Sequence, residues 1–276
     1  MKRQPPVRVK KFPSLSWSGC SDTGKIRKNN EDAFLGLQFD ARETFRLGKF
    51  GEASLEKNDY TFAVCDGMGG AKSGEFASRI AVEKITTLLP RAFQQSASGL
   101  NAGFSDVLTE LFTQIHSALV FVGSSYEETE GMQTTLSLCW FTPGWMYFGH
   151  IGDSRIYHLP RRKKEIKQVT QDDTYVGWLY RNGKISEHEA RTHPRRNVLQ
   201  KALGGGNQFI DPQVGAIGYE RGDIFLLCTD GLTEGLFDPQ LIEHLRADDG
   251  SAQSLVEASI KNSGLDNTTA LVIRMT

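Results

Sequence analysis

The sequence has no excess of charge of either sign. Its 276 residues include 32 Lys and Arg against 33 Asp and Glu, which gives a formal net charge of -1. A nucleic-acid protein that relies on a broad basic face needs an excess of cations, so we expect no nucleic-acid partner. The hydrophobic fraction of 39% is ordinary for a globular protein and excludes wholesale disorder.

Paired cysteines are absent as well. Four cysteines are scattered along the chain without any C-x-x-C spacing: Cys20, Cys65, Cys139 and Cys228. The last three fall in predicted strands, so buried, reduced thiols are the expected state. Nothing in this pattern requires an oxidising compartment, and we expect the protein to be cytoplasmic.

The chain also lacks a convincing membrane-spanning segment. Residues 131–152 carry no charge over a length that could cross a bilayer, but Pro143 and Gly144 interrupt them. Because the flanks are rich in strand formers, this stretch predicts two strands and a turn. The basic N-terminal residues are not followed by an apolar run. Residues 1–14 are therefore expected to form a solvated basic tail and not a secretory signal.

Several familiar cofactor motifs are missing. The six histidines show no H-E-x-x-H or Cys/His spacing, which disfavours zinc, and His150 is interpreted as an ordinary strand histidine. There is no Walker A sequence, no dinucleotide-binding G-x-G-x-x-G loop and no EF-hand pattern. Metal chemistry would therefore need a different arrangement of ligands.

What the chain does contain is a mixture of amphipathic helices and apolar strands. Helical periodicity predicts long helices over 74–89, where Pro90 ends the segment, and over 105–122. Shorter helices are expected at 185–191, 239–246 and 252–261. Predicted strands lie at 61–66, 134–141, 145–151, 154–159, 223–229 and 269–275. Helices and strands do not alternate regularly, so we predict an α+β fold in which sheets pack together under helices.

The sequence predicts a single domain over residues 15–276, because no internal repeat or Pro/Ser-rich linker divides it. Two polar stretches, 40–59 and 170–206, are interpreted as long loops between strands, and the second contains a helix candidate. Loops of this length are uncommon and often functional.

Acidic residues stand at the ends of the most apolar strands. They are Asp66, Asp153, Asp230 and Asp266, with Glu31 and Asp32 as a fifth site before another apolar run. Each alone could be an ordinary turn aspartate. Converging carboxylates, however, repel one another unless they are protonated or bind cations, and all-oxygen sites favour Mg2+ or Mn2+. Neighbouring glycines would let a backbone carbonyl approach such an ion.

Arg27 lies four residues before Glu31. Beside a pair of metal ions, its planar guanidinium could hold two phosphate oxygens. The alternative is a surface cation that pairs with Asp32, and the sequence leaves both interpretations open.

Together these segments resemble the bacterial branch of the metal-dependent Ser/Thr protein phosphatases, type 2C. The family fold implies two packed antiparallel β-sheets flanked by helices on both faces. The resemblance extends over about 250 residues and rests on SDTGKIRKNNEDAF at 21–34, VCDGMGG at 64–70, TTL at 134–136, GHIGDSRIYHL at 149–159, EARTHPRRNVLQKALG at 189–204, LLCTDGL at 226–232 and DNTTALVI at 266–273.

The resemblance implies a site for two Mn2+ or Mg2+ ions. Asp66 would bridge the two ions, and the Gly67 carbonyl would bind one of them. Asp230 and Asp266 would complete the ligands of the other ion, and Glu31 would act mainly through a bound water.

The same resemblance implies roles around the substrate. Arg27 would hold the phosphate, Asp32 would orient Arg27 and the metal waters, and Asp153 would contribute to a third, weaker metal site. A hydroxide bridging the metals would attack phosphoserine or phosphothreonine in proteins directly, beside a flap formed by 170–206. Such an enzyme would oppose bacterial Ser/Thr kinases, and we expect a monomer that does not bind membranes.

Four features depart from the family pattern. Met68 stands where eukaryotic members carry a histidine proposed as general acid; Met is common there in bacterial members, and the leaving-group acid is unassigned. Asp173 stands where the family often has His, which could alter the charge of the flap and the choice of substrate. Gln133 stands where the family usually has Gly. The stretch 40–59 is longer than is usual in the family, which suggests that it is a surface for a partner.

Two other functions are alternatives. A binding module could use the same fold to hold phosphoproteins without turnover; loss of metal ligands would favour it, and this chain shows no such loss. A two-metal nuclease also uses clustered carboxylates, but the balanced charge argues against the basic channel that it needs.

Overall fold

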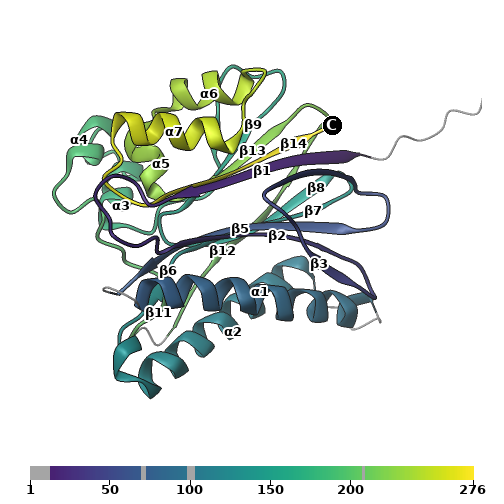
Figure 1. Cartoon of the computed structure of the whole chain (residues 1–276), viewed down its shortest axis with the longest axis horizontal. Coiled ribbons are helices and arrows are strands. Elements are labelled where there is room, and N and C mark those ends of the chain that lie inside the picture. Colours follow the sequence, from purple (N-terminus) through teal and green to yellow (C-terminus); the bar gives the residue numbers. More distant parts are fainter. Residues whose placement is uncertain (1–12, 70–72, 98–102, 207–208) are drawn as a thin grey trace, which may run out of the picture.

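The protein is a four-layer sandwich in which two β-sheets pack face to face between two layers of helices (Figure 1). The computed structural model describes residues 13–69, 73–97, 103–206 and 209–276. The predicted α+β architecture with helices on both faces is confirmed. Of the predicted tail, residues 1–12 lie outside the described residues, and Ser14 already opens the first strand.

The first sheet has six antiparallel strands. Their order is β10 (Lys167–Gln168), β9 (Arg155–Leu159), β13 (Ile224–Cys228), β14 (Thr268–Met275), β1 (Ser14–Asp22) and β4 (Phe50–Ser54). β14 is apolar on both faces because it lies at the centre of this sheet. Leu271 and Ile273 face the other sheet, whereas Ala270 and Val272 face the helices.

The second sheet is built around β5. The strand order is β11 (Leu203–Gly204), β6 (Gln133–Thr134), β5 (Asp59–Met68), β7 (Leu136–Thr142), β8 (Trp145–Ile151) and β12 (Gln213–Gly218), with β2 (Asp32–Phe39) paired to β5 and β3 (Thr44–Arg46) paired to β2. Phe62 and Val64 of β5 point into the core between the sheets, and Ala63 and Cys65 point toward the helices.

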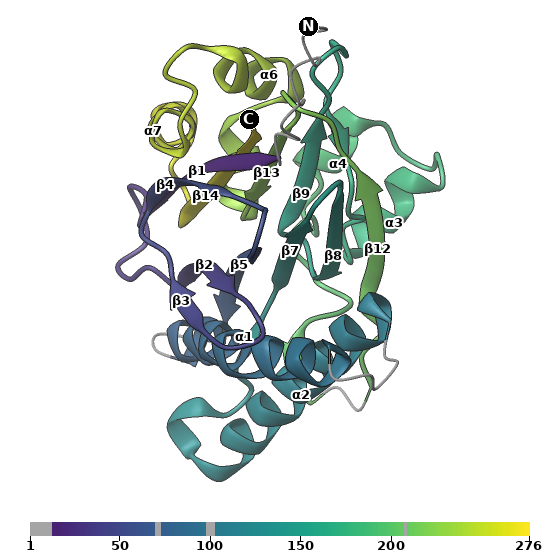
Figure 2. The ribbon, with the colours of Figure 1, turned by 90° about the vertical axis from the view of Figure 1, so that its right-hand side faces the viewer.

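Helices cover the outer face of each sheet (Figure 2). The second sheet carries α1 (Ser73–Ala97) and α2 (Phe104–Ser125), followed by the 3-10 helix η1 (Glu127–Thr129). The first sheet carries α5 (Asp230–Gly235), α6 (Asp238–Arg246) and α7 (Ala252–Asn262). Two short helices, α3 (Tyr175–Arg181) and α4 (Glu187–Thr192), lie in the flap segment 170–206.

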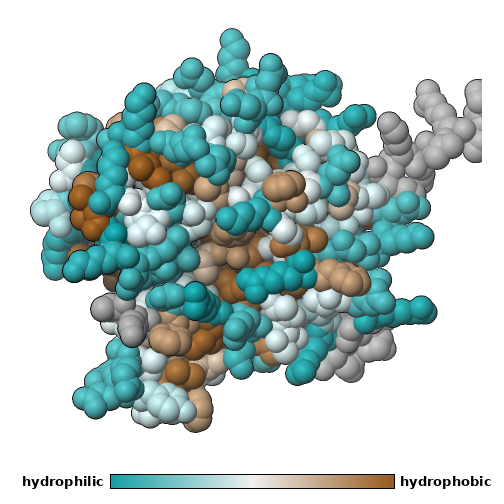
Figure 3. Space-filling model, viewed as in Figure 1, coloured by the Kyte–Doolittle hydropathy of each residue, from teal (hydrophilic) through white to brown (hydrophobic). Residues whose placement is uncertain are grey.

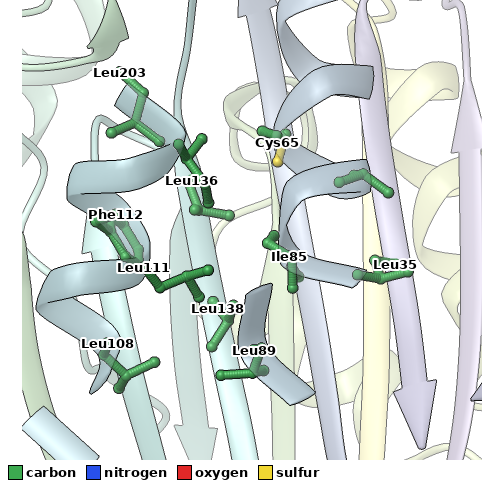
Figure 4. Close-up of a cluster of buried hydrophobic side chains, with 14 of the residues drawn as sticks. Leu35, Cys65, Ile85, Leu89, Leu108, Leu111, Phe112, Leu136, Leu138 and Leu203 are labelled. Atoms are coloured by element: carbon green, nitrogen blue, oxygen red, sulfur yellow. The ribbon is translucent and has the colours of Figure 1, made fainter. Parts of the chain in front are cut away.

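The buried face of α2 explains the apolar character of this helix. Among the described residues, α2 is the one helix long and apolar enough to cross a membrane. Its residues Leu108, Leu111 and Phe112 pack with Leu136 and Leu138 of β7 in the core between helices and sheet (Figure 4). Burial of each such side chain stabilises the fold by about 1.5–3 kcal/mol.

Pro90 does not end the first long helix, contrary to the prediction. The helix α1 continues to Ala97 with Pro90 inside it. A proline inside a helix removes one backbone hydrogen bond, but tertiary packing holds the next turn in place. The ring of Phe93 makes edge contacts with Phe39 and Trp140, at centroid distances of 5.4 and 6.0 Å.

The stretch 40–59 is not a long loop, which corrects a second prediction. It folds into β3 and β4, which pair with β2 in one sheet and β1 in the other. The exposed polar side chains that suggested a loop belong to short edge strands, one face of which is solvated.

Candidate active site

The predicted acidic residues gather at one end of the sandwich, at the left in Figure 1, where β5 ends and β14 begins. They surround a cavity of about 490 Å³, which we call the catalytic cavity. Its lining includes Arg27, Glu31, Asp66, Gly67, Met68, Asp153, Asn197, Leu199, Asp230, Asp266 and Asn267. The fold therefore brings together the predicted site residues from separate segments, with Asp32 immediately behind them.

Asp66 is held by the neighbouring strand through its backbone. Its N–H donates to the Thr135 hydroxyl, and its carbonyl accepts from the Thr134 hydroxyl and the Thr135 N–H, each at 2.9 Å. These backbone hydrogen bonds fix the position of residue 66 near the end of β5. The strand register places Asp66 directly opposite Asp32 of β2.

Asp32 connects the two sheets. One carboxylate oxygen, Oδ2, accepts from the hydroxyls of Thr229 and Thr269 at 2.8 and 2.7 Å, while the buried Oδ1 has no hydrogen-bond partner. The family resemblance had implied that Asp32 orients Arg27, but within the described residues no direct hydrogen bond joins the two. Oδ2 of Asp32 bonds to the two threonines, and Arg27 contacts Asp266.

Gly67 lies where only a glycine fits. Its N–H donates to the Glu31 carbonyl at 3.2 Å. A Cβ at this position would lie 2.0 Å from the carbonyl oxygen of Gly74, at the start of α1. The strand end, the Glu31 segment and the helix start are thus packed backbone to backbone at the cavity wall.

Arg27, Asp230 and Asp266 also line the cavity. The guanidinium Nη2 lies 2.6 Å from Asp266 Oδ2. Asp230 is the first residue of α5, where a carboxylate is favoured by the helix dipole, and its Oδ1 is buried without a partner. Buried polar atoms normally have a hydrogen-bond partner, so an unpartnered carboxylate oxygen in a cavity is consistent with a ligand for a metal ion.

Asp153 stands in the turn between β8 and β9, and the base of the flap holds that turn. Gly152 N donates to Asp173 Oδ2 at 3.1 Å, and Asp173 N donates back to the Gly152 carbonyl at 2.7 Å. Arg155 makes a bidentate contact with Asp172, with Nε donating to Oδ1 at 3.0 Å and Nη2 donating to Oδ2 at 2.7 Å. Asp173 is thus a buried anchor at the base of the flap, and its effect on the charge of the flap and on the choice of substrate stays a prediction.

The residues that hold the acidic side chains in place could not be identified from the sequence. Asn267 is nearly buried and joins three segments: its Oδ1 accepts from Glu31 N at 2.7 Å, and its Nδ2 donates to the carbonyls of Thr23 and Asn29. The only signal was its place in the DNTT segment. Hydroxyl and amide side chains of this kind have no periodicity that would mark them as part of a site.

The other singled-out positions have structural contacts. His150 is buried between the Ser137 hydroxyl and the Gly152 carbonyl, at 2.8 and 3.1 Å, and burial lowers its pKa to about 4, so it is neutral. This agrees with the interpretation as a strand histidine. Gln133 pairs with Met68 in the sheet, and its side chain packs against Gly205 at the end of the flap.

The carboxylates raise one another's pKa. The pKa of Asp66 and of Asp153 is raised well above the usual range, mainly by burial and to a smaller extent by repulsion from neighbouring acids. Burial also raises the pKa of Asp32 and of Asp230 to about 7. Such a cluster is charged at neutral pH only if cations compensate it.

We therefore expect the metal-free protein to lose stability as the pH rises from about 4 to about 7. The folded chain retains protons on Asp32 and Asp230 in this window, whereas the unfolded chain releases them near the ordinary aspartate pKa of about 3.9. Urea unfolding in EDTA at pH 5.0 and 7.5 measures the effect. Asp230→Asn should flatten the slope, and a parent protein that is more stable at pH 7.5 would contradict the expectation.

The oxygen donors suit hard divalent cations that keep part of their water. Within the described residues, no three His, Cys, Asp or Glu side chains lie close enough to hold an ion by themselves. Mg2+ typically binds through one or two carboxylates and several waters. One buried carboxylate oxygen each of Asp32 and Asp230 has no hydrogen-bond partner. The cluster offers only oxygen ligands, which suit Mg2+ or Mn2+ better than zinc.

Comparison with known protein families matches residues 49–263 to the family described as protein phosphatase 2C. The chain belongs to the protein phosphatase 2C family. The matched range includes the segment 170–206 and, of the acidic residues described above, Asp66, Asp153 and Asp230.

Relatives of this phosphatase 2C chain include bacterial proteins. The serine/threonine protein phosphatase PstP of Mycobacterium tuberculosis is 31% identical over 94% of the chain, which spans 44% of the length of that relative. The serine/threonine phosphatase stp of Listeria monocytogenes is 30% identical, covering 92% of this chain and 93% of that protein.

Solved structures agree with this assignment. The M. tuberculosis PstP/Ppp structure superimposes with a TM-score of 0.76 at 30% identity, over 95% of this chain and 98% of that chain. The PstP catalytic domain in complex with two manganese ions gives a TM-score of 0.72 at 28% identity, over 96% and 100% of the two chains.

Proposed function

We propose that this protein is a metal-dependent phosphatase that hydrolyses phosphoserine and phosphothreonine in proteins. The observation that carries the proposal is the gathering of Asp66, Asp230, Asp266 and Glu31 with Arg27 around one cavity. Membership of the phosphatase 2C family and the names of its bacterial relatives support the substrate class.

Two Mn2+ or Mg2+ ions would be held by Asp66, the Gly67 carbonyl, Asp230, Asp266 and, through water, Glu31. When bound, such a pair activates a water as nucleophile near neutral pH and neutralises phosphate charge. Asp153 would contribute to a third ion. The two manganese ions of the PstP catalytic domain support this number and identity.

The protein's own groups would then position the substrate. Arg27 lies on the cavity wall with one guanidinium nitrogen on Asp266. Because a guanidinium carries five N–H donors in a fixed fork, the others can receive phosphate oxygens. Asp32 would hold Thr229 and Thr269, and through them the two sheets, at a constant separation behind the cavity.

Phosphate release from a phosphothreonine peptide tests the function. The purified protein should release phosphate with Mn2+ and should stop when EDTA is added. Tight peptide binding with no release in Mn2+ or Mg2+ would favour the binding module, and cleavage of single-stranded or duplex DNA would favour the nuclease.

Arg27→Ala should raise KM for a phosphopeptide by about 10-fold with a smaller change in kcat, because the lost contact is with the substrate phosphate. Steady-state kinetics in Mn2+ measures both constants. Arg79→Ala, on the exposed face of α1, serves as the matched control. An unchanged KM in Arg27→Ala would make Arg27 a surface cation.

We further propose that the protein opposes Ser/Thr kinases, acts in the cytoplasm and works as a monomer. Reduced cysteines support the compartment, since the four cysteines form no disulfide in the described residues. Light scattering of the purified protein would test the monomer.

A further inference from the structure

A second cavity opens beside the catalytic one, and we call it the flap chamber. It has a volume of about 520 Å³ and lies between α3 and α4 of the flap, the ends of β9 and β10, and α5. Asp153, Asn197 and Asp230 line both cavities. The two spaces are therefore neighbours with a shared wall, and the chamber falls within the size range of ligand pockets.

Two ion pairs lie among the charged groups that line the flap chamber. Arg155 donates to both carboxylate oxygens of Asp172. Arg196 contacts Glu234 at 2.9 Å. Two further arginines, Arg181 and Arg191, donate to the backbone carbonyls of Asp172 and Thr233. The lining holds four arginines, which are Arg155, Arg181, Arg191 and Arg196, and five acids, which are Asp153, Asp172, Asp230, Glu234 and Asp238. The charges of the chamber therefore nearly balance.

Three large apolar side chains of the chamber lining are exposed, and the guanidinium of Arg191 lies over the ring of one of them, Phe237, at 4.1 Å. Tyr180 of α3, Phe237 between α5 and α6, and Leu265 between α7 and β14 line the chamber and are 48%, 50% and 54% exposed. Apolar side chains are visible at the surface at this end of the molecule, where α3, α5 and α7 meet (Figure 3). Large apolar residues from three segments that converge on one opening mark a contact surface.

Continuity with the catalytic cavity identifies the occupant. Leu265 directly precedes Asp266, and Phe237 follows the short helix that Asp230 opens. A polypeptide whose phosphoresidue lies in the catalytic cavity would pass the shared wall at Asn197 and reach the chamber within a few residues, since an extended chain advances about 3.3–3.6 Å per residue.

We propose that the flap chamber binds an apolar side chain of the substrate polypeptide, close in sequence to the phosphoresidue, and that Tyr180, Phe237 and Leu265 determine this specificity. The inference rests on the proposed phosphatase function for the placement of the phosphoresidue. It assigns to the chamber a preference for leucine- or phenylalanine-like neighbours.

A set of phosphothreonine peptides tests the proposal. Each peptide carries a single Leu at one of the three positions on either side of the phosphothreonine, with Ala elsewhere, and one peptide has only Ala. Binding is measured by fluorescence anisotropy in Mn2+ with a non-hydrolysable phosphonate in place of the phosphate ester. Leu at one or two positions should bind about 10-fold more tightly than Ala.

The variants Phe237→Ala and Tyr180→Ala should reduce that difference to less than about threefold. Trp178→Ala is the matched control, because Trp178 is a half-exposed aromatic of the same helix α3 that does not line the chamber. Two chamber variants are compared so that, if one fails to fold, the other still tests the loss of the Leu preference. All three should hydrolyse p-nitrophenyl phosphate at the parent rate, since this small substrate does not reach the chamber.

Equal binding of the Leu and Ala peptides at every position would overturn the chamber proposal, as would a full Leu preference in both chamber variants. Failure of the parent to release phosphate from p-nitrophenyl phosphate and from phosphopeptides would instead overturn the proposed function. The binding comparison needs no turnover and decides the role of the chamber in either case.

Discussion

Asp66→Asn should lower the Mn2+-dependent release of phosphate by about 10³-fold. The substitution keeps the shape of the side chain but removes the charge that would be shared between two cations. The backbone contacts of residue 66 with Thr134 and Thr135 do not involve the carboxylate, so the strand should keep its place. Rates of the variant and the parent are compared at saturating Mn2+ on the same phosphopeptide.

The matched control is Asp59→Asn, at the other end of the same strand. Asp59 is also a partly buried carboxylate, and burial raises its pKa to about 6, but it accepts a hydrogen bond from Trp140 Nε1 far from the cavity. This variant should retain the parent rate. Asp66→Asn should also be more stable than the parent in EDTA, because folding no longer requires residue 66 to be protonated at neutral pH. The variant should gain less stability from added Mn2+. Equal rates in Asp66→Asn and parent would mean that the active centre lies elsewhere.

Gly67→Ala should reduce activity by at least about 10²-fold, although it adds only a methyl group. That methyl would meet the Gly74 carbonyl oxygen at 2.0 Å and the Glu31 carbonyl oxygen at 2.8 Å, so backbone must move. A displacement of about 1 Å at a catalytic group can cost 10²-fold. Phosphate release together with urea unfolding measures the change, since the strained variant should also be less stable.

Gly206→Ala controls for the general effect of replacing a glycine near the site, because a Cβ there meets nothing within 4 Å. It should leave both rate and stability close to those of the parent. A fully active Gly67→Ala would show that the wall between β5 and α1 can relax and that its geometry does not determine the position of the metal ligands.

The layers of the fold were predictable because the central strands follow simple rules. β5 and β14 are apolar on both faces, and each is buried between a sheet and a helix layer. The edges were harder to predict. β4 alternates exposed and half-buried residues, and it pairs with β1 across the intervening strands β2 and β3, which belong to the other sheet. Pro90 misled the prediction because the packing of Phe93 on Phe39 and Trp140, which no local pattern reveals, stabilises the following turn.

For the site, the sequence indicated which residues meet but not how they are held. The carboxylates could be found because aspartate after an apolar strand is a recognisable pattern, and the family motifs then ordered them. The contact of Arg27 with Asp266, and not with Asp32, depends on side-chain positions 239 residues apart. The burial of Asp173 at the base of the flap depends likewise on the turn that carries Asp153.

The pairing of β1 with β14 has a consequence during synthesis. Ser21 in β1 bonds to Thr269 in β14, 248 residues later, and β14 also carries the threonine that fixes Asp32. At roughly 5–20 residues per second, the first strand waits on the order of 10–50 s on the ribosome for its partner. The emerging chain therefore has no complete catalytic centre until β14 is released, and a chaperone that shields β1 during this interval would protect the protein from aggregation.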